Sequence, residues 1–370
     1  MKYLKIVLVH VLICVCVNLN AQNSKVKYAK RSIPTDYLKA ANIQTAKSRY
    51  KTLLAGAFDL TSLLPRGYRK DGTVDYTKYL QEGLDKYAKV VFPNFPIMIN
   101  DKGLNIRSNS IVLFPENSKI TLKPSRSGRY ELLRIHDKHN VEILFPKIDG
   151  NRDKHLGHDG EWGVGISIYS SKDVKIYNPQ VENCWGDGIT VSKLSTSLPS
   201  QNIKIFYPRL NHNRRNGLSI ASAINLEIIN PVISNTYGIP PMAAIDIEPA
   251  SQAYTLQNIL IESPITFNSR YGIILALTRA SGKNSKPIDI KINNHLDHLS
   301  TIGFRVARFK PVYKQNPALK GTIIISNPIW KENKMKSLEV EETFNLTPTI
   351  IFKGGNVGIQ NKKGQKISKQ

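Results

Sequence analysis

The sequence predicts an all-β protein built as a parallel β-helix, a solenoid in which short strands stack coil upon coil. A self-similar unit recurs through the middle of the chain, and its starts lie 23 to 31 residues apart. Its short apolar strands are separated every few residues by Asn, Gly, Pro or Ser, a pattern without a helical period. The units begin at Gly165-Ile-Ser-Ile, Gly188-Ile-Thr-Val, Gly217-Leu-Ser-Ile, Ala244-Ile-Asp-Ile, Gly272-Ile-Ile-Leu and Gly303-Phe-Arg-Val.

Each unit contains a second short strand, and Asn-Pro pairs recur at Asn178, Asn230 and Asn327. The second strands are Val174-Lys-Ile-Tyr, Ile203-Lys-Ile-Phe, Leu226-Glu-Ile-Ile, Ile259-Leu-Ile-Glu and Ile288-Asp-Ile-Lys. The units are too short for a propeller blade and lack the helical half of most other repeats. We therefore expect each strand to pair with its equivalent one coil away.

Strand alternation divides the first strand of each unit into an inner and an outer column. The apolar positions that we expect to stack inside the solenoid are Ile166, Ile189, Leu218, Ile245 and Ile273. The outer column, which we expect to face solvent, consists of Ser167, Thr190, Ser219, Asp246, Ile274 and Arg305.

A solenoid needs a cap at each open end, because its core and its strand edges are otherwise exposed. Residues 75–88 predict a capping helix with Asp75 as its N-cap and with Leu80, Leu84 and Tyr87 on one face. The C-terminal residues 356–370 form a basic tail without apolar periodicity.

The N-terminus reads as a signal peptide that covers residues 1–21. Lys2 and Lys5 precede the apolar stretch 6–17, and the small residue Ala21 suits a cleavage site. The apolar part is too short to span a bilayer, and no later stretch is long enough either. We therefore expect a secreted or periplasmic protein without a membrane span, in which residues 22–62 form an N-terminal extension.

Composition and charge narrow the function classes. The chain has 370 residues, 41% of them hydrophobic, which excludes wholesale disorder. Only Cys184 lies outside the apolar N-terminus, so a disulfide framework and a cysteine-rich metal cluster are excluded. The 52 basic and 28 acidic residues leave a net charge of +24, which favours a polyanionic partner. Because no nucleic-acid-binding signature is present, an acidic polysaccharide or oligosaccharide is the expected partner and no nucleic acid is expected.

The run Gly72-Thr-Val-Asp75, the expected helix and Val90-Val-Phe-Pro93 resemble the opening segment of the pectin-lyase-like right-handed β-helix superfamily. With the repeats, the resemblance covers residues 63–355, and it implies a right-handed solenoid over that domain. The superfamily includes hydrolases, lyases, epimerases, phage depolymerases and adhesive stalks, so the resemblance alone does not select a reaction.

Polygalacturonases of this superfamily carry N-T-D, D-D and G-H-G triplets on successive coils. The matching triplets here are Trp185-Gly-Asp187, Arg214-Arg-Asn216 and Met242-Ala-Ala244. Asp187 matches the first motif, whereas the second aspartate and the histidine are missing. The chain therefore resembles a polygalacturonase- or depolymerase-like relative with a different site.

Three carboxylates on the outer face are the candidate catalytic groups. Asp246 and Glu248 should point to the same side about 6.6 Å apart, with Asp187 roughly 10 Å away. An inverting glycosidase needs an acid and a base about 6.5–9.5 Å apart, and crowded carboxylates raise one pKa so that one remains protonated. The expected substrate-binding residues are Arg214, Arg215, Arg270, Tyr271, Trp185 and His212.

The leading hypothesis is a glycoside hydrolase that acts on an acidic glycan without a metal or other cofactor. The second is a polysaccharide lyase, in which Asp187, Asp246 and Glu248 would hold Ca²⁺ and an arginine or Tyr271 would act as the base. The third is a non-catalytic glycan-binding or surface protein.

Overall fold

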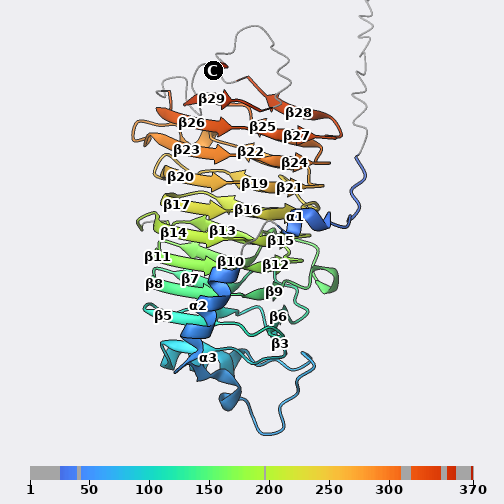
Figure 1. Ribbon diagram of the computed structural model, residues 1–370, viewed down its shortest axis with the longest axis vertical. Helices are drawn as coiled ribbons and strands as arrows, with labels where there is room; N and C mark the ends of the chain where they lie inside the picture. Colours follow the sequence, from blue (N-terminus) through green and yellow to red (C-terminus); the bar gives the residue numbers. More distant parts are fainter. Residues whose placement is uncertain are drawn as a thin grey trace, which may run out of the picture.

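The computed structural model describes residues 26–39, 43–195, 197–309, 318–342, 348–355 and 368–369. In these residues the chain forms an elongated stack of parallel strands, which confirms the all-β solenoid (Figure 1). The expected signal peptide, residues 1–21, lies outside the described residues, as does most of the tail 356–370, so both stay predictions.

Three parallel sheets run along the solenoid. The coils from β2 to β28 each contribute one strand to each sheet, and β1, β29 and β30 extend sheet A alone. Sheet A comprises, in spatial order, β1 (Phe58–Asp59), β2 (Lys89–Val91), β5 (Ser110–Leu113), β8 (His139–Leu144), β11 (Lys172–Tyr177), β14 (Ser200–Phe206), β17 (Ala223–Ile229), β20 (Leu256–Glu262), β23 (Ile288–Asn293), β26 (Gly321–Ser326), β29 (Thr349–Lys353) and β30 (Ser368–Lys369). Sheet B comprises β3 (Pro96–Ile99), β6 (Lys119–Leu122), β9 (Lys147–Asp149), β12 (Gln180–Glu182), β15 (Arg209–Asn211), β18 (Val232–Ser234), β21 (Ile265–Phe267), β24 (Leu296–His298) and β27 (Ile329–Lys331). Sheet C comprises β4 (Leu104–Asn105), β7 (Arg129–His136), β10 (Trp162–Tyr169), β13 (Ile189–Ser192), β16 (Asn216–Ile220), β19 (Ala243–Ile247), β22 (Tyr271–Leu275), β25 (Ile302–Val306) and β28 (Lys336–Val340).

The repeats align in the register that their sequences predict. In sheet C, Leu218 of β16 pairs with Ile189 of β13 and with Ile245 of β19, so the first strands of successive units stack directly. In sheet A the second strands of successive units also stack. Ile259 of β20 pairs with Ile290 of β23, and not with Ile288, the first residue of the next second strand.

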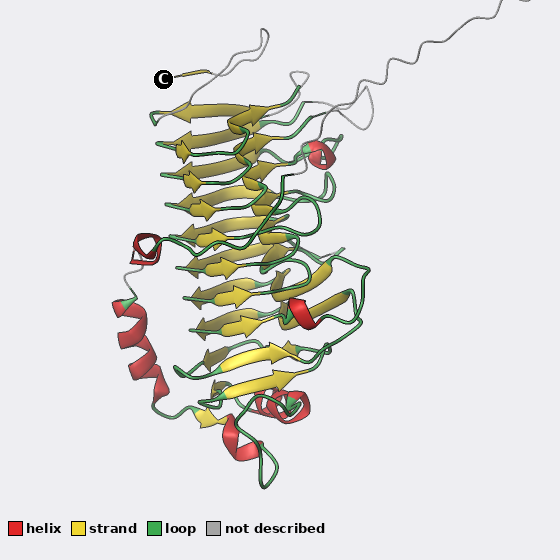
Figure 2. Cartoon of the chain, turned by 90° about the vertical axis from the view of Figure 1, so that its right-hand side faces the viewer, coloured by secondary structure: helices red, strands yellow, loops and turns green. Residues whose placement is uncertain are grey.

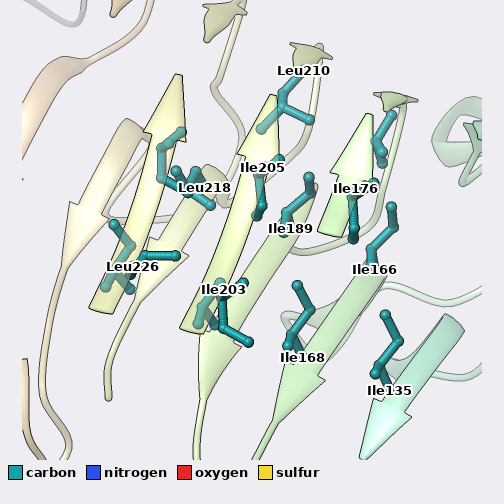
Figure 3. Packing of buried hydrophobic residues seen from close by; sticks show 14 of the residues in the cluster. Ile135, Ile166, Ile168, Ile176, Ile189, Ile203, Ile205, Leu210, Leu218 and Leu226 are labelled. Carbon is teal, nitrogen blue, oxygen red and sulfur yellow. The ribbon is translucent and has the colours of Figure 1, made fainter. Parts of the chain in front are cut away.

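Aliphatic side chains from all three sheets fill the interior. Figure 3 shows Ile189 and Leu218 of sheet C, Ile203 and Ile205 of sheet A, and Leu210 of sheet B pointing toward one another. Like residues from successive coils form columns, so the core is a continuous rod rather than a single centre.

Truncation inside this rod should be costly. Ile205 is fully buried, and we expect Ile205→Ala to lower the free energy of unfolding by about 2–5 kcal/mol. The matched control is Ile329→Ala, because Ile329 is 52% exposed and should change stability by less than about 0.5 kcal/mol. Urea unfolding measures both values, and equal losses would contradict the single interior core.

Glycine begins most of the repeats because the chain passes close to sheet B there. A Cβ at Gly165 would lie 2.3 Å from Val181 Cγ1, and one at Gly217 would lie 2.2 Å from Ile233 Cγ2. No larger residue fits these positions without moving the opposite sheet.

Single residues with positive φ make the sharp turns from sheet A into sheet B. Asn178, Asn230 and Asn327 have φ angles of 48°, 49° and 50°, a region that asparagine tolerates better than most residues. Each precedes a proline, which explains the Asn-Pro repeats.

Helices cap and flank the solenoid (Figure 2). The capping helix α3 (Thr77–Lys86) begins two residues after Asp75, whose Oδ1 accepts a hydrogen bond from Thr77 N at 3.0 Å. The N-cap is thus Tyr76, and the expectation for Asp75 is wrong by one residue although its carboxylate still bonds the helix start. The other helices are α1 (Thr35–Lys39), α2 (Gln44–Leu54), and the 3₁₀ turns η1 (Leu60–Leu63), η2 (Arg152–Lys154) and η3 (Thr278–Ala280).

Helix α2 lies against sheet A, where Arg49 Nη2 donates to Glu142 Oε2 at 2.6 Å and Tyr50 packs edge-on against Phe145. Within the described residues, no helix is both long enough and apolar enough to cross a membrane.

Candidate functional site

The candidate site lies on the outer face of sheet C. Asp246 lies between the core residues Ile245 and Ile247 and points away from the interior, as predicted. It pairs in register with Ser219 of the preceding coil.

Apart from Arg305, which is partly exposed, the outer column is buried rather than solvent-facing, which corrects the expectation from alternation. Ser167, Thr190, Ser219 and Ile274 are buried, and Asp246 is only 2% exposed. Polar groups of this column bond to other side chains, as Ser167 does to His136 and Asp246 does to Asn216.

Arg215 joins two of the three candidate carboxylates. Its Nη1 lies 3.0 Å from Asp187 Oδ2, and its Nη2 lies 3.5 Å from Glu248 Oε2. The side chains of Arg215, Asp187 and Glu248 are 16%, 8% and 32% exposed. Burial alone would lower the pKa of Arg215, but the Asp187 and Asp246 carboxylates outweigh it and raise that pKa.

A hydrogen-bond network connects Asp187 to Asp246. Ser219 Oγ donates to Asp187 Oδ2 at 2.8 Å, and Asn216 Nδ2 lies 3.0 Å from Ser219 Oγ and 2.9 Å from Asp246 Oδ2. Thr190 Oγ1 also lies 3.3 Å from Asp187 Oδ2. The network holds carboxylates from two coils in one arrangement.

Asp246 is the carboxyl group whose environment favours the protonated form. Burial, followed by the charge of Glu248, raises its pKa to about 8, although Arg215 acts in the opposite direction. Its Oδ1 has no hydrogen-bond partner among the described residues. Asp246 is therefore protonated at neutral pH.

This pKa predicts a pH-dependent stability. From about pH 4 to about pH 8, folded Asp246 holds a proton that the unfolded chain has released, so the free energy of unfolding falls as pH rises through this window. Asp246→Asn removes this titration. The free energy of unfolding of the variant, relative to that of the wild type, should therefore rise as the pH increases from about 4 to about 8. Paired urea titrations across the range measure the difference, and a constant difference would contradict the raised pKa.

Arg214 and Trp185 lie beside the carboxylates rather than among them. The Arg214 guanidinium stacks 3.8 Å from the centre of the Trp185 ring, and its Nη1 donates to Gly160 O at 2.7 Å. His155 stacks on the same ring at 3.9 Å. Two groups thus pack against this ring, and the expected substrate-binding role of Trp185 stays a prediction. Of the two adjacent arginines, Arg215 alone contacts the carboxylates.

His212 is also separate from the carboxylates. It occupies a turn with φ of 57°, and its Nδ1 lies 2.8 Å from Asn183 Oδ1. Burial, assisted by Arg152, lowers its pKa to about 4, so it is neutral at pH 7. These contacts place His212 in the turn, and its expected role in substrate binding stays a prediction.

Tyr271 is buried between two arginines. Its ring centre lies 5.0 Å from the Arg270 guanidinium and 4.8 Å from that of Arg305, which also donates to its hydroxyl. It packs against Ile274 and Ile302. Tyr271 is therefore less accessible than Arg270, which remains partly exposed, and the substrate-binding role expected for both stays a prediction.

Sequence reasoning missed a second polar group on the same face, formed by Glu131, His136 and Tyr169. His136 Nε2 lies 2.9 Å from Ser167 Oγ and 3.3 Å from Glu131 Oε2, and its ring stacks on Tyr169 at 4.6 Å. Burial lowers the pKa of His136 to about 4 and raises the pKa of Glu131. His136 pairs in register with Tyr169, just as Arg134 pairs with Ser167. His136 and Tyr169 lie two residues further along their strands, at the next outward-facing position. Including that position in the outer column would have identified them from the sequence.

With this geometry established, comparison with known proteins identifies the family. The family model "Right handed beta helix region" matches residues 94–280. The chain belongs to the right-handed β-helix family.

Relatives of this right-handed β-helix protein are distant. The uncharacterized protein YclG of Bacillus subtilis (strain 168) is 27% identical over 269 residues, 65% of this chain and 45% of YclG. The chain thus spans about half the length of the curated relatives it matches.

Solved structures share the fold. The tailspike protein of E. coli bacteriophage HK620, solved with a hexasaccharide, has a TM-score of 0.57 and 11% identity, covering 82% of this chain and 57% of the tailspike. The family 28 exopolygalacturonase of Yersinia enterocolitica has a TM-score of 0.54 and 12% identity, covering 82% and 66%. Both share the parallel β-helix fold of this chain.

In this β-helix protein, one guanidinium contacts two of the three candidate carboxylates. Across the described ranges, no group of three or more His, Cys, Asp or Glu residues is placed to hold a metal ion. The Arg215 guanidinium lies between Asp187 and Glu248 instead.

Proposed function

We propose that this protein is an exported glycoside hydrolase that cleaves an acidic glycan on the outer face of sheet C. The observation that carries the proposal is the arrangement around Arg215. A buried carboxyl group with a pKa of about 8, Asp246, lies next to two carboxylates that share one arginine. Separating the pKa values of neighbouring carboxyl groups is how glycosidases keep an acid and a base together at one pH.

The residues divide into roles by exposure and contacts. Asp246 would donate its proton to the glycosidic oxygen as the C–O bond breaks. Glu248, the most exposed of the three, would take a proton from the attacking water, as in an inverting mechanism. Asp187 is fully engaged by Arg215, Ser219 and Thr190, and so acts as a positioning residue.

Arg215 would recognise the acidic group of the substrate. Its contact with Glu248 is long, at 3.5 Å, whereas its contact with Asp187 is 3.0 Å. A substrate carboxylate could therefore take the place of Glu248 on Nη2 while Asp187 still holds the guanidinium. That exchange frees Glu248 to act as the base and opens access to Asp246.

The structural neighbours support a glycan substrate. One is an exopolygalacturonase, and another was solved with a bound hexasaccharide. These neighbours support the class of ligand. Because their sequence identity to this chain is low, they do not support a particular sugar.

The direct test is to incubate the protein, without residues 1–21, with polygalacturonate, alginate and sulfated polysaccharides, with and without EDTA. Reducing ends and the ultraviolet absorbance of unsaturated uronides are followed together. Hydrolysis predicts reducing ends without absorbance, unaffected by EDTA. Absorbance that rises with reducing ends would establish the lyase alternative. Saturable binding without products would establish the non-catalytic one.

A further inference from the structure

A cavity lies on the outer face of sheet B, on a different side of the solenoid from the carboxylates of sheet C. Residues of five successive strands, from β6 to β18, line it together with Ile33 and Leu38 of the N-terminal segment. We call it the sheet B cavity. Its volume is about 210 Å³, below the roughly 300–1,000 Å³ of pockets that hold drug-sized molecules, so its ligand must be small.

The N-terminal segment, residues 28–38, completes this cavity because hydrogen bonds fix it on the solenoid. Asn235 Oδ1 accepts from Arg31 N at 3.0 Å, and Asn235 Nδ2 donates to Arg31 O at 3.0 Å. Near the other end of the segment, the Tyr37 hydroxyl lies 2.9 Å from His298 Nδ1. Figure 1 shows α1, at the end of this segment, beside β15. The segment is thus held at two points on either side of its first cavity-lining residue.

Arg209 supplies a half-buried cation to the sheet B cavity. Its Nη2 donates to Leu38 O at 3.0 Å, and this acceptor is neutral. In the described part of the chain, no Asp or Glu pairs with Arg209, and burial lowers the pKa of its guanidinium. A guanidinium withdrawn from water without a counter-ion favours a bound anion, and its planar donors match a carboxylate.

The opposite end of the cavity is already neutralised. Glu182 is the one carboxylate among the described residues that line the cavity, and its Oε1 lies 3.0 Å from Lys119 Nζ. The same ammonium group lies 2.8 Å from Asp149 Oδ2. Lys119 therefore has its counter-ions within the protein, whereas Arg209 does not. An incoming anion is directed toward Arg209.

Aliphatic side chains surround the guanidinium on its other sides. Val232, which is buried, pairs in register with Arg209 and lies one coil away, about 4.8 Å at the backbone. Ile33 and Leu38 line the same cavity from the N-terminal segment. Gln180 pairs with Arg209 from the preceding coil and contributes an amide donor. The cavity thus combines one cation, one amide and an aliphatic wall.

We propose that the sheet B cavity binds a small organic acid with one carboxylate and a short aliphatic tail. The carboxylate contacts Arg209, with the amide of Gln180 beside it. The tail packs against Ile33, Leu38 and Val232. An inorganic anion such as sulfate fits less well, because aliphatic side chains leave most of its oxygens without hydrogen bonds. The site does not rest on the proposed hydrolase function.

The test measures binding of hexanoate, hexanol and sulfate to the protein by calorimetry and ligand-observed NMR. We expect saturable binding of hexanoate, and about tenfold weaker binding of hexanol, which has the same tail without the carboxylate. Arg209→Met should weaken hexanoate binding about tenfold or more. The matched control is Lys175→Met, which removes an exposed cation of sheet A and should change binding less than about twofold.

A second variant is needed because Arg209 also holds the backbone of Leu38. Val232→Phe leaves both of these groups in place but fills the cavity, so it should abolish hexanoate binding. Thermal unfolding verifies that each variant is folded. An independent readout is hydrogen exchange: bound hexanoate should slow exchange of the amides of residues 28–38, since this segment lines the cavity.

Four outcomes would overturn the proposal. No saturable binding of hexanoate to the wild type would remove the site. Hexanol that binds as tightly as hexanoate, or equal losses in Arg209→Met and Lys175→Met, would remove the role of Arg209. Unchanged binding to Val232→Phe would place the acid elsewhere on the molecule. Sulfate that binds more tightly than hexanoate would make the cavity a site for inorganic anions.

Discussion

Asp246→Asn is expected to lower kcat on the acidic polysaccharide by about 10²–10⁴-fold, the usual contribution of a general acid. Asparagine keeps the size of the side chain and can still contact Asn216, but it carries no acidic proton. The affinity for substrate should change little, because Arg215 remains. Initial rates and direct binding to the same polysaccharide separate the two effects.

The control for this variant is Asp289→Asn, which removes an exposed carboxylate from sheet A and should leave kcat unchanged. Full activity of Asp246→Asn would place the acid elsewhere on the face, with the Glu131 and His136 pair as the next candidate. A loss of structure cannot explain a loss of rate if the variant also shows the stability gain expected between about pH 4 and about pH 8.

Arg215→Met is expected to reduce both stability and activity. Removing the guanidinium leaves the Asp187 carboxylate, only 8% exposed, without its cation. Breaking a buried ion pair in this way costs about 3–5 kcal/mol of unfolding free energy. Activity should fall through KM as well as kcat, because Arg215 is proposed to bind the acidic group of the substrate.

The double variant Asp187→Asn with Arg215→Met distinguishes charge from packing. If the uncompensated carboxylate causes the loss, the second substitution should recover most of the stability measured by urea unfolding, without restoring activity. A double variant as unstable as Arg215→Met would show instead that the guanidinium acts mainly through packing.

The repeat architecture was readable from the chain because a solenoid is local. Each coil contacts only its neighbours, so the spacing of Gly165, Gly188 and Gly217 predicts strands that pair one coil apart. Alternation within a strand then assigns Ile245 and Ile247 to the core and Asp246 to the outer face. These inferences need only strand geometry, and the register confirms them.

The composition of the site depended on contacts that a repeat pattern does not encode. Alternation placed Asp246 outside but could not predict its burial, which raises its pKa to about 8. Adjacent residues have similar sequence signals, yet Arg215 joins the carboxylates while Arg214 stacks on Trp185. Side-chain direction at a strand entrance decides between them.

The N-terminal segment makes the same point over a longer range. Nothing in residues 28–31 predicts a partner more than 200 positions away, whereas the folded solenoid presents Asn235 and Asn268 one coil apart to bond their backbone. Strand order, register and inward-facing residues followed from periodic sequence because they depend on neighbours one coil away. Burial, ionisation and the pairing of charges were decided by the tertiary structure, since they depend on side chains that only the folded chain brings together.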